Sequence, residues 1–489
     1  MSDRLQSARA RFQQIWGYED FRAPQEEIIQ TLLEGRDALI ILPTGGGKSI
    51  CFQLPALLQS GLTIVISPLV ALMENQVTQL RQLGLSGALL HSELPRAERK
   101  KTLWAIAKQQ LSLLYLSPET LLSLPVWELI CQPELKITGI VLDEAHCLTQ
   151  WGTTFRPAYR RLGAVRRSLL KHKPQGTKIA IAAFTATADP QAQEEIIRAL
   201  ELHQPKKFLI SPYRQNLRLQ FQTVWTPRGR KQSMLRFIQA HQGQSGLVYV
   251  RSRQDSKTLA IWCKSIGYAA AAYHAGLVTT ARRRIEQEWI SGKIQFVICT
   301  SAFGMGIDKA DARFIVHYHT PGLLSEYIQE VGRAGRDGKP ANALTLISEP
   351  TGLLDPGDKQ RSQFFTSKLE QQYRQAQQLV KQLPQQGNVA DLKEQFAAGE
   401  ITLGILHSVG LLYWQDPFHY CRRSPSVDWR SLTSSQQQQR QLMQRYLRTK
   451  RCRWQYLLHA FGFPNEAQGF SCGSCDNCRR QIKNKISRK

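Results

Sequence analysis

Short apolar runs alternate with longer amphipathic stretches along most of this chain. Between residues 37 and 210 the apolar runs are short and are bounded by polar or turn-forming residues. Because strands buried on both faces read as continuous apolar runs, this alternation predicts a parallel α/β sheet. The predicted strands are Ala38–Leu42, Thr63–Ser67, Ser112–Leu116, Thr138–Leu142 and Lys178–Phe184.

The same alternation starts again after a linker at residues 211–218. Its predicted strands are Ser245–Val250, Ala269–Tyr273, Gln295–Thr300, Phe314–Tyr318 and Ala343–Ile347. Beyond about residue 350 the pattern becomes helical and rich in Gln, with a small module at 389–423. We therefore expect α/β domains at 1–210 and 211–350, a helical region at 351–440 and a C-terminal region at 441–489.

A glycine-rich turn follows the first predicted strand. Residues 42–49 read Leu-Pro-Thr-Gly-Gly-Gly-Lys-Ser, and the next residues can form a helix. Backbone N–H groups in such a turn hold phosphate, the Lys reaches the β- and γ-phosphates, and the Ser hydroxyl binds Mg²⁺. The expected nucleotide contacts are Thr44, Gly45, Gly46, Gly47, Lys48 and Ser49. The strict pattern has glycine where this chain has Leu42, so a plain glycine-rich turn is the alternative.

Two acidic residues come directly after the predicted strand that ends at Leu142. The sequence there is Asp143-Glu144-Ala145-His146. At the carboxyl end of a parallel strand, Asp143 is placed to hold Mg²⁺, and Glu144 is placed to orient and deprotonate an attacking water. The alternative is a helix N-terminus with favourable acidic residues.

Two arginines in the second α/β domain are candidates for the charge that phosphoryl transfer needs. They lie in the stretch Gln329-Glu-Val-Gly-Arg333-Ala-Gly-Arg336. Arg333 and Arg336, three residues apart, could reach a γ-phosphate held by the first domain. A surface arginine pair on a helix is the alternative.

Four of the ten cysteines cluster near the C-terminus. Cys472, Cys475 and Cys478 have metal-ligand spacing, and Cys452 lies 20 residues upstream. Four thiolates make a closed tetrahedral zinc site, which predicts a structural metal. Cys421 in place of Cys452, and an iron–sulfur cluster in place of zinc, are the alternatives.

The net charge of +26 predicts a polyanionic partner. The excess is greatest at the end of the chain, where residues 422–489 hold 15 Lys or Arg against three Asp or Glu. Nucleic acid is therefore favoured over an anionic membrane surface. The N-terminus lacks the apolar region of a signal peptide, and the longest charge-free stretch is broken by turn signals, so we expect a cytoplasmic, nucleoid-associated protein.

The motifs and their order resemble superfamily 2 helicases and, within them, the RecQ family of DNA helicases. The matching motifs are Phe21–Gln25, 43–49, Ser67–Leu69, Asp143–His146, Phe184–Thr187, Thr300–Asp308 and 329–338. Residues 16–18, the segment 150–157 and the cysteine cluster narrow the match to RecQ. The resemblance implies two tandem RecA-like domains followed by a helical, zinc-binding region. It also implies ATP, Mg²⁺ and Zn²⁺ as cofactors, with single-stranded, forked and duplex DNA as partners.

The resemblance also assigns roles to single residues. Tyr18 and Arg22 would sandwich the adenine and Gln25 would read its edge, while Gly306, Asp308 and Gln329 would face the ATP cleft. The implied DNA contacts are Trp151, Phe155, Arg156, Arg251, His274 and Thr300. The segment around Trp151 matches an aromatic-rich loop that couples single-stranded DNA to hydrolysis. This chain has Thr153-Thr154 where the family commonly has His-Asp.

Larger family members continue beyond the zinc module with a winged-helix domain and a further helical domain. This chain resembles the short bacterial form that lacks both, and residues 389–423 are a hypothetical substitute for the winged helix. The resemblance implies 3′-to-5′ unwinding in recombination and repair, with a single-stranded DNA-binding protein as a further candidate partner. An RNA helicase and a non-translocating annealing protein are the competing functions.

Overall fold

A computed structural model of the chain describes residues 2–43, 45–149, 156–303, 307, 309–423 and 429–487. These residues form two compact units. Unit 1 comprises residues 1–210 and 370–428, and unit 2 comprises residues 211–369 and 429–489. No helix in the described part of the chain has both the length and the hydropathy needed to cross a membrane.

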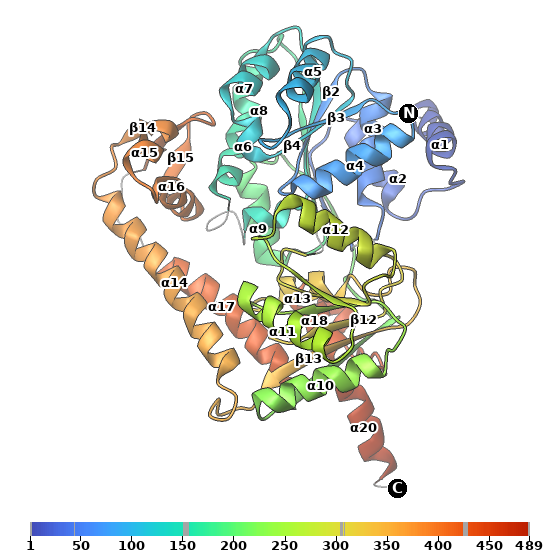
Figure 1. Cartoon of the computed structure of the whole chain (residues 1–489). Helices are drawn as coiled ribbons and strands as arrows, with labels where there is room; N and C mark the ends of the chain where they lie inside the picture. Colours follow the sequence, from blue (N-terminus) through green and yellow to red (C-terminus); the bar gives the residue numbers. More distant parts are fainter. Residues whose placement is uncertain are drawn as a thin grey trace. The chain divides into compact units, whose positions relative to one another are not determined.

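A seven-stranded parallel sheet forms the centre of unit 1. Its order is β3-β4-β2-β5-β6-β1-β7, and Figure 1 labels β2, β3 and β4 among its strands. All five strands predicted for this part of the chain are confirmed, whereas β3 and β7 were not predicted. The strands are β1 (Ala38–Ile41), β2 (Leu62–Ile66), β3 (Gly87–Leu90), β4 (Leu113–Leu116), β5 (Ile137–Leu142), β6 (Ala180–Thr185) and β7 (Lys206–Leu209).

Helices cover both faces of this sheet, which is why its inner strands are largely apolar, whereas the edge strand β7 contains two lysines. In β1, Leu39 and Ile41 belong to the core on one face, and Ala38 and Ile40 belong to the core on the other. The helices are α1 (Ser2–Trp16), α2 (Gln25–Leu33), α3 (Lys48–Leu58), α4 (Val70–Gln82), α5 (Arg96–Ala107), α6 (Pro118–Leu121), α7 (Leu124–Cys131), α8 (Gly163–Leu170) and α9 (Pro190–Ala199). Two 3₁₀-helices, η1 (Ala145–Leu148) and η2 (Pro157–Arg161), lie between β5 and α8.

A buried carboxylate joins three parts of unit 1 at the start of β1. Asp37 accepts hydrogen bonds from Arg166 of α8 at 2.7 Å and from the backbone N–H groups of Ile181 and His203 at 2.8 and 2.7 Å. The Asp37 side chain is 4% exposed and that of Arg166 is 9% exposed. A charge this deeply buried is tolerated only because it is paired and fully hydrogen-bonded.

Unit 2 is built on a second parallel sheet, of six strands in the order β10-β11-β9-β12-β13-β8. Its strands are β8 (Leu217–Val224), β9 (Gly246–Tyr249), β10 (Ala270–Tyr273), β11 (Phe296–Cys299), β12 (Phe314–His317) and β13 (Ala341–Ser348). Its helices include α10 (Pro227–Gln239), α11 (Arg253–Ser265), α12 (Thr279–Ile290) and α13 (Leu324–Val331). The five predicted strands are again confirmed. The expected linker at 211–218 instead runs into β8, which pairs with β13 along eight residues.

The Gln-rich region begins with the 24-residue helix α14 (Gly357–Val380), and the boundary between the units falls within it. Next comes a small module of residues 386–423, with a three-stranded antiparallel sheet in the order β14-β16-β15. Its elements are β14 (Gln386–Asn388), α15 (Val389–Gln395), α16 (Gly399–Ser408), β15 (Leu412–Trp414) and β16 (His419–Arg422). The module covers the range 389–423 expected from the sequence, and β14 adds a strand before it.

The rest of the chain returns to unit 2 through α17 (Trp429–Arg448), α18 (Arg453–Ala460), α19 (Pro464–Ala467) and α20 (Asp476–Ile486). Arg440 of α17 donates a hydrogen bond to the Thr366 hydroxyl of α14, and Figure 1 shows these two helices side by side. The region predicted at 351–440 is thus divided between the two units, whereas residues 441–489 belong to unit 2 alone.

Replacing Arg166 with Met should destabilise unit 1, because the Asp37 carboxylate would stay buried without its counter-charge. We expect the free energy of unfolding to fall by about 3 kcal/mol, measured on the first transition in urea. The matched control is Lys100→Met on the exposed surface of α5, which should change stability by less than about 0.5 kcal/mol. Equal stability of the two variants would contradict this account of Asp37.

Candidate functional site

The glycine-rich turn stands between β1 and α3, as the sequence predicted. Gly45 and Gly47 have φ angles of +87° and +71°, in the left-handed region where residues with a Cβ are strained. Helix α3 begins at Lys48, so the free N–H groups of its first turn face the same end of the sheet. These are the features of a phosphate-binding helix N-terminus.

Gln25 connects this turn to the segment predicted to hold the base. Its side-chain oxygen accepts a hydrogen bond from the Arg22 N–H at 2.9 Å, and its Nε2 donates to the Gly46 carbonyl at 3.3 Å. Gln25 is 4% exposed, whereas Tyr18 is 53% exposed and Arg22 is also exposed. The structure therefore leaves the side chains of Tyr18 and Arg22 exposed while it fixes the Gln25 amide beside the turn.

Asp143 and Glu144 lie at the end of β5. The Asp143 N–H still pairs with the Ile66 carbonyl of β2 at 2.9 Å, so the strand holds its position. Glu144 then adopts a left-handed conformation with φ of +54°, which is uncommon for a residue with a side chain and typical of functional sites. Its Oε1 lies 3.7 Å from the Lys48 Nζ. Two strands that are not neighbours, β1 and β5, thus bring Lys48 and the acidic pair together.

Electrostatics at this edge favour a bound cation. Burial and the neighbouring Glu144 carboxylate raise the pKa of Asp143 to about 6, although Lys48 lowers it. A divalent cation would remove that destabilisation, because it favours the charged form of both carboxylates. The site therefore suits Mg²⁺ bound together with a nucleoside triphosphate, with Ser49 and Asp143 facing the metal and Lys48 facing the phosphates.

His146 connects the acidic turn to the strand that lies between β5 and β1. Its Nδ1 is 3.1 Å from Glu144 Oε2 and 3.1 Å from the Thr185 hydroxyl at the end of β6. The same hydroxyl accepts a hydrogen bond from the Thr187 N–H at 3.2 Å. The motifs at 143–146 and 184–187 are thereby joined side chain to side chain, an arrangement that no local sequence pattern predicts.

The two predicted arginines of unit 2 follow α13. Arg333 is 7% exposed, Arg336 is partly buried, and the Arg336 Nη1 lies 3.4 Å from the Ile307 carbonyl. Gln329 lies on α13 and is 9% exposed. Sequence reasoning missed Arg214 and Asn216, which fix this segment by donating hydrogen bonds to the Gly335 carbonyl. The sequence feature that could have identified Arg214 and Asn216 is their position directly before strand β8.

The predicted DNA contacts of unit 2 gather at the carboxyl ends of β9, β10 and β11. His274 follows β10, Thr300 follows β11, and the Thr300 N–H donates to the Tyr273 carbonyl at 3.1 Å. Burial and the nearby Lys257 and Arg253 lower the pKa of His274, so this edge is electropositive. The contacts of these residues with DNA stay predictions.

Arg251, at the same edge, has partners within the protein. Its guanidinium bonds both carboxylate oxygens of Glu330, at 3.1 and 2.9 Å, and its exposed fraction is 10%. Glu330 is also 3.0 Å from His317. Sequence reasoning missed Glu330. The ion pair shows that Arg251 also stabilises the structure at this edge, in addition to its predicted contact with DNA.

In unit 1, Arg156 pairs with Glu119 at 3.0 Å, and its contact with DNA also stays a prediction. The other predicted positions lie outside the described residues: Thr44, Trp151, Phe155, Gly306 and Asp308. The same applies to Thr153-Thr154, where the chain departs from the family pattern.

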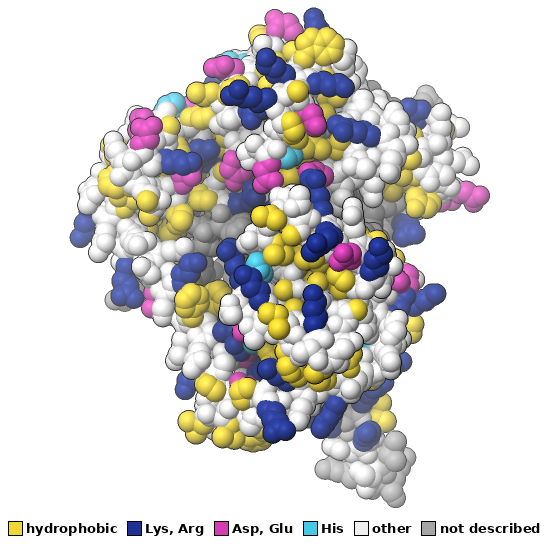
Figure 2. All heavy atoms as spheres, viewed as in Figure 1, with side chains coloured by type: hydrophobic (Ala, Val, Ile, Leu, Met, Phe, Trp, Pro, Cys, Tyr) yellow, Lys and Arg dark blue, Asp and Glu magenta, His cyan; other side chains and the backbone are white. Residues whose placement is uncertain are grey.

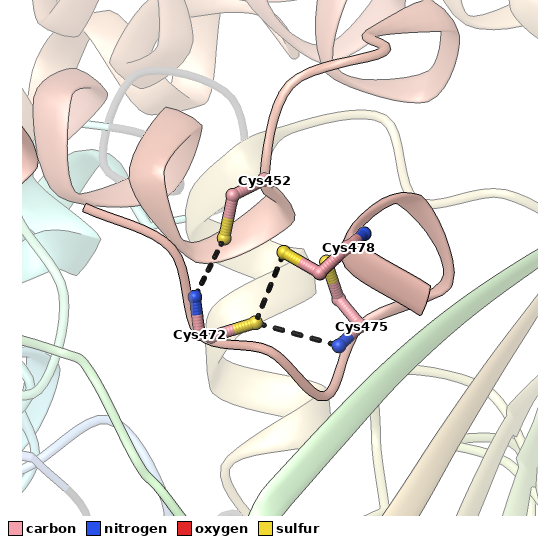
Figure 3. Close-up of side chains that lie close together, drawn as sticks. All are labelled: Cys452, Cys472, Cys475 and Cys478. Carbon is pink, nitrogen blue, oxygen red and sulfur yellow. Dashed lines mark hydrogen bonds between the residues drawn. The ribbon is translucent and has the colours of Figure 1, made fainter. Parts of the chain in front are cut away.

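The four clustered cysteines converge as Figure 3 shows. The sulfur atoms of Cys452, Cys472, Cys475 and Cys478 all lie within 4.8 Å of one another. Backbone N–H groups donate to the sulfur atoms, from Cys472 to Cys452 at 3.3 Å and from Cys475 to Cys472 at 3.4 Å. Such hydrogen bonds stabilise thiolates, and four close thiolates suit a tetrahedral zinc ion with no open position. Cys421 is in β16 of unit 1 and is not part of the cluster.

The zinc site is built into the edge of the second sheet. Arg453 forms an ion pair with Asp476 at 2.9 Å and stacks over the Phe221 ring at 3.8 Å. The Trp454 indole donates to the Leu217 carbonyl at 3.2 Å, so α18 packs on β8. The metal would therefore stabilise the structure that covers this edge strand.

Three protein-family models match the chain. The model of the DEAD/DEAH box helicases matches residues 22–196, that of the helicase conserved C-terminal domain matches residues 229–338, and that of the RecQ zinc-binding domain matches residues 427–479. The ATP-dependent DNA helicase RecQ of Synechocystis is 52% identical over 98% of this chain and 99% of its own length. RecQ of Haemophilus influenzae is 39% identical over 73% of this chain and 56% of its own length.

Solved structures support the fold. Yeast Dbp5, solved with RNA and ADP-BeF3, matches 73% of this chain with a TM-score of 0.57 and 18% identity. Mycobacterium smegmatis Lhr, solved with single-stranded DNA and AMP-PNP, matches 83% with a TM-score of 0.54 and 18% identity. At such low identity these structures support only the tandem arrangement of two helicase-type sheets.

Gly47→Ala should weaken ATP binding by about tenfold or more, because a left-handed alanine costs one to two kcal/mol and its Cβ displaces the loop. That Cβ would lie 2.3 Å from Gln25 Nε2. The matched control is Gly84→Ala, which has φ of +69° and no atom within 4 Å of the added carbon. Titration with a fluorescent ATP analogue measures both. Equal affinities would refute the role given to the Gln25 contact.

Cys475→Ser should abolish zinc binding, because three thiolates do not close the site. Elemental analysis of the purified protein should find one zinc per chain in the wild type and almost none in the variant. Cys421→Ser is the control and should keep its zinc. Loss of zinc from the Cys421 variant, or its retention in the Cys475 variant, would overturn the ligand assignment.

Proposed function

Since this chain belongs to the RecQ family of DNA helicases, we propose that it uses ATP hydrolysis to unwind DNA, moving 3′ to 5′ along one strand. The observation that carries the proposal is the convergence of Lys48, Asp143 and Glu144 at one edge of the first sheet, within a chain that matches a RecQ helicase over nearly its full length. Recombination and repair are the processes that the family suggests.

In this proposal the first sheet binds and activates the nucleotide. Tyr18 and Arg22 flank the adenine, and Gln25 reads its edge while it braces the phosphate loop. Lys48 neutralises the β- and γ-phosphates, and Mg²⁺ bound by Ser49 and Asp143 supplies further positive charge to the reacting phosphoryl group. Glu144 accepts the proton of the attacking water, and His146 holds Glu144 against Thr185.

The second sheet is proposed to complete the reaction and to grip DNA. Arg333 and Arg336 would stabilise the charge that develops on the γ-phosphate, with Gln329, Gly306 and Asp308 beside the nucleotide. His274 and Thr300 would contact DNA phosphates, and Trp151, Phe155 and Arg156 of the first domain would contact unpaired bases. Arg251, whose guanidinium also holds Glu330, would be a further contact with DNA at this edge.

Surface charge supports a nucleic acid as the partner. In Figure 2, Lys and Arg side chains are spread over the part that contains α10 and α12, where few acidic side chains appear. Helix α12 alone has three consecutive arginines, at 282–284. Phosphate contacts of this kind give affinity without sequence specificity, as an unwinding enzyme requires.

The test is steady-state ATP hydrolysis without nucleic acid, with single-stranded DNA and with single-stranded RNA, followed by unwinding of duplexes that have a single 3′ or 5′ tail. We expect stimulation by DNA and unwinding only from the 3′ tail. Glu144→Gln should keep ATP binding but lose turnover by about a hundredfold or more, because the general base is missing. Glu98→Gln, on the exposed surface of α5, should behave as wild type.

Each competing function gives a different result. Equal stimulation by RNA would favour an RNA helicase, and DNA binding without stimulated hydrolysis would favour an annealing protein. Unwinding only from the 5′ tail would refute the proposed polarity.

A further inference from the structure

The module of residues 386–423 is docked on unit 1 by its second helix. Helix α16 is buried along most of its length: Thr402, Leu403, Ile405 and Leu406 are each 0–1% exposed. It packs against η2, the short helix of residues 157–161. A helix so covered is part of an interface between the module and the first domain.

Polar and aromatic contacts hold both ends of this interface. Arg198 of α9 donates a 3.1 Å hydrogen bond to the carbonyl of Ser408, the last residue of α16. The positive charge of Arg198 also interacts favourably with the negative end of the helix dipole. Burial and the nearby Arg160 and Arg198 lower the pKa of His407 to about 3, so its imidazole is neutral. At the hairpin tip, Phe418 packs edge-on against Trp127 of α7, with ring centroids 5.4 Å apart.

These contacts argue against a direct grip on duplex DNA. In helix-turn-helix proteins the second helix enters the major groove, and here that helix, α16, is buried against protein. The module is also slightly acidic, with Asp391, Glu394, Glu400 and Asp416 against Lys393, Arg422 and Arg423. The rest of this chain, with its net charge of +26, is much better suited to contact DNA phosphates than this module is.

The docked surface lies close behind the catalytic turn. Helix η2 contacts η1, which starts directly after Glu144. Tyr159 of η2 is fully buried, and burial together with the neighbouring Cys147 raises its pKa. Arg160 of η2 pairs with Glu195 of α9, a helix that also contacts η1. Contacts therefore run without a gap from α16 through η2 to the turn that holds Asp143 and Glu144.

We propose that the docked module is a positioning element for η2, and that it sets how strongly single-stranded DNA stimulates ATP hydrolysis. In the sequence, η2 directly follows Arg156, and the proposed function takes its base contacts Trp151, Phe155 and Arg156 from the segment just before η2. The module thus holds one end of the connection between that segment and the catalytic turn. This inference rests on the proposed function, and it makes Phe418, Trp127 and the residues of α16 positioning residues.

The register of the small sheet provides a clean way to remove the module. Gln386 pairs with Cys421, and the Arg422 N–H donates to the Gln385 carbonyl at 2.8 Å. The two ends of the module are therefore adjacent in space. Residues 386–421 can be replaced by a Gly-Gly-Ser bridge that leaves α14 and α17 connected.

The experiment compares four proteins with wild type: Phe418→Ala, Trp127→Ala, the double variant and the bridged deletion. Tyr413→Ala is the matched control, since Tyr413 lies on the same hairpin but is 37% exposed. For each we measure basal kcat, kcat at saturating single-stranded DNA and the DNA concentration that gives half-maximal stimulation. Zinc content and unfolding midpoints report that both units are folded.

We expect Phe418→Ala and the deletion to keep basal kcat but to lower the ratio of stimulated to basal kcat at least threefold, or to raise the half-maximal DNA concentration by as much. The double variant should be no worse than the Phe418 variant, because the two rings act as one contact. A merely structural role would lower both kcat values in proportion, leave their ratio unchanged and overturn the inference.

Two further outcomes separate this inference from its alternatives. In the first, DNA stimulates the wild type, which also unwinds it, and all variants keep the wild-type ratio of stimulated to basal kcat and the wild-type half-maximal DNA concentration. If these variants nevertheless bind forked duplex more weakly, the module grips duplex DNA and the inference is wrong. If DNA does not stimulate even the wild type, the proposed function fails, and the inference fails with it.

Discussion

The parallel pairing of β5, β6 and β1 is the constraint on which the catalytic arrangement depends. Ile41 at the end of β1 is in register with Thr185 of β6, and Leu142 at the end of β5 is in register with Ala183. The phosphate loop and the acidic turn therefore leave the sheet two strand spacings apart, or about 10 Å. That distance lets Lys48 reach Glu144 across the strand between them. No loop conformation could restore the contact if the strand order were different.

Much of this arrangement could be predicted from the sequence, because its signals are local. Apolar runs gave ten strands of the two sheets, and spacing gave the phosphate loop, the acidic turn and the zinc ligands. Strand β8 was not predicted, because the sequence analysis assigns residues 211–218 to a linker. The alternation of Leu217, Leu219 and Phe221 with polar residues was the signal for this strand. The bond between His146 and Thr185, the ion pair of Arg251 and the docking of α16 join residues far apart in sequence, and no local pattern specifies them.

Buried charges show how unit 2 prepares its arginines. Glu330 and Arg251 neutralise each other within the sheet edge. Burial raises the pKa of Glu330, but Arg251 and His317 outweigh burial and leave the pKa lowered. Arg214 and Asn216 fix the backbone at Gly335. The φ angle of this glycine is +59°, and the neighbouring atoms also leave no space for a side chain there. An arginine positioned in advance loses little entropy when it meets a phosphate, so the stabilisation goes to the transition state.

The chain passes between the compact units three times, and one of these passages is α14 itself. Near its start, Asp355 and Asp358 pair with the buried Arg230 of unit 2, at 2.8 and 3.0 Å. Its far end leads into the module that is docked on unit 1. A continuous helix of this length is about 36 Å long and bends little. Relative motion of the two sheets, which ATP-driven unwinding requires, would therefore act on the docked α16 and on η2 behind it. A flexible linker would absorb such motion, whereas a helix that is held near its start by Arg230 and leads into the docked module would pass it on to α16.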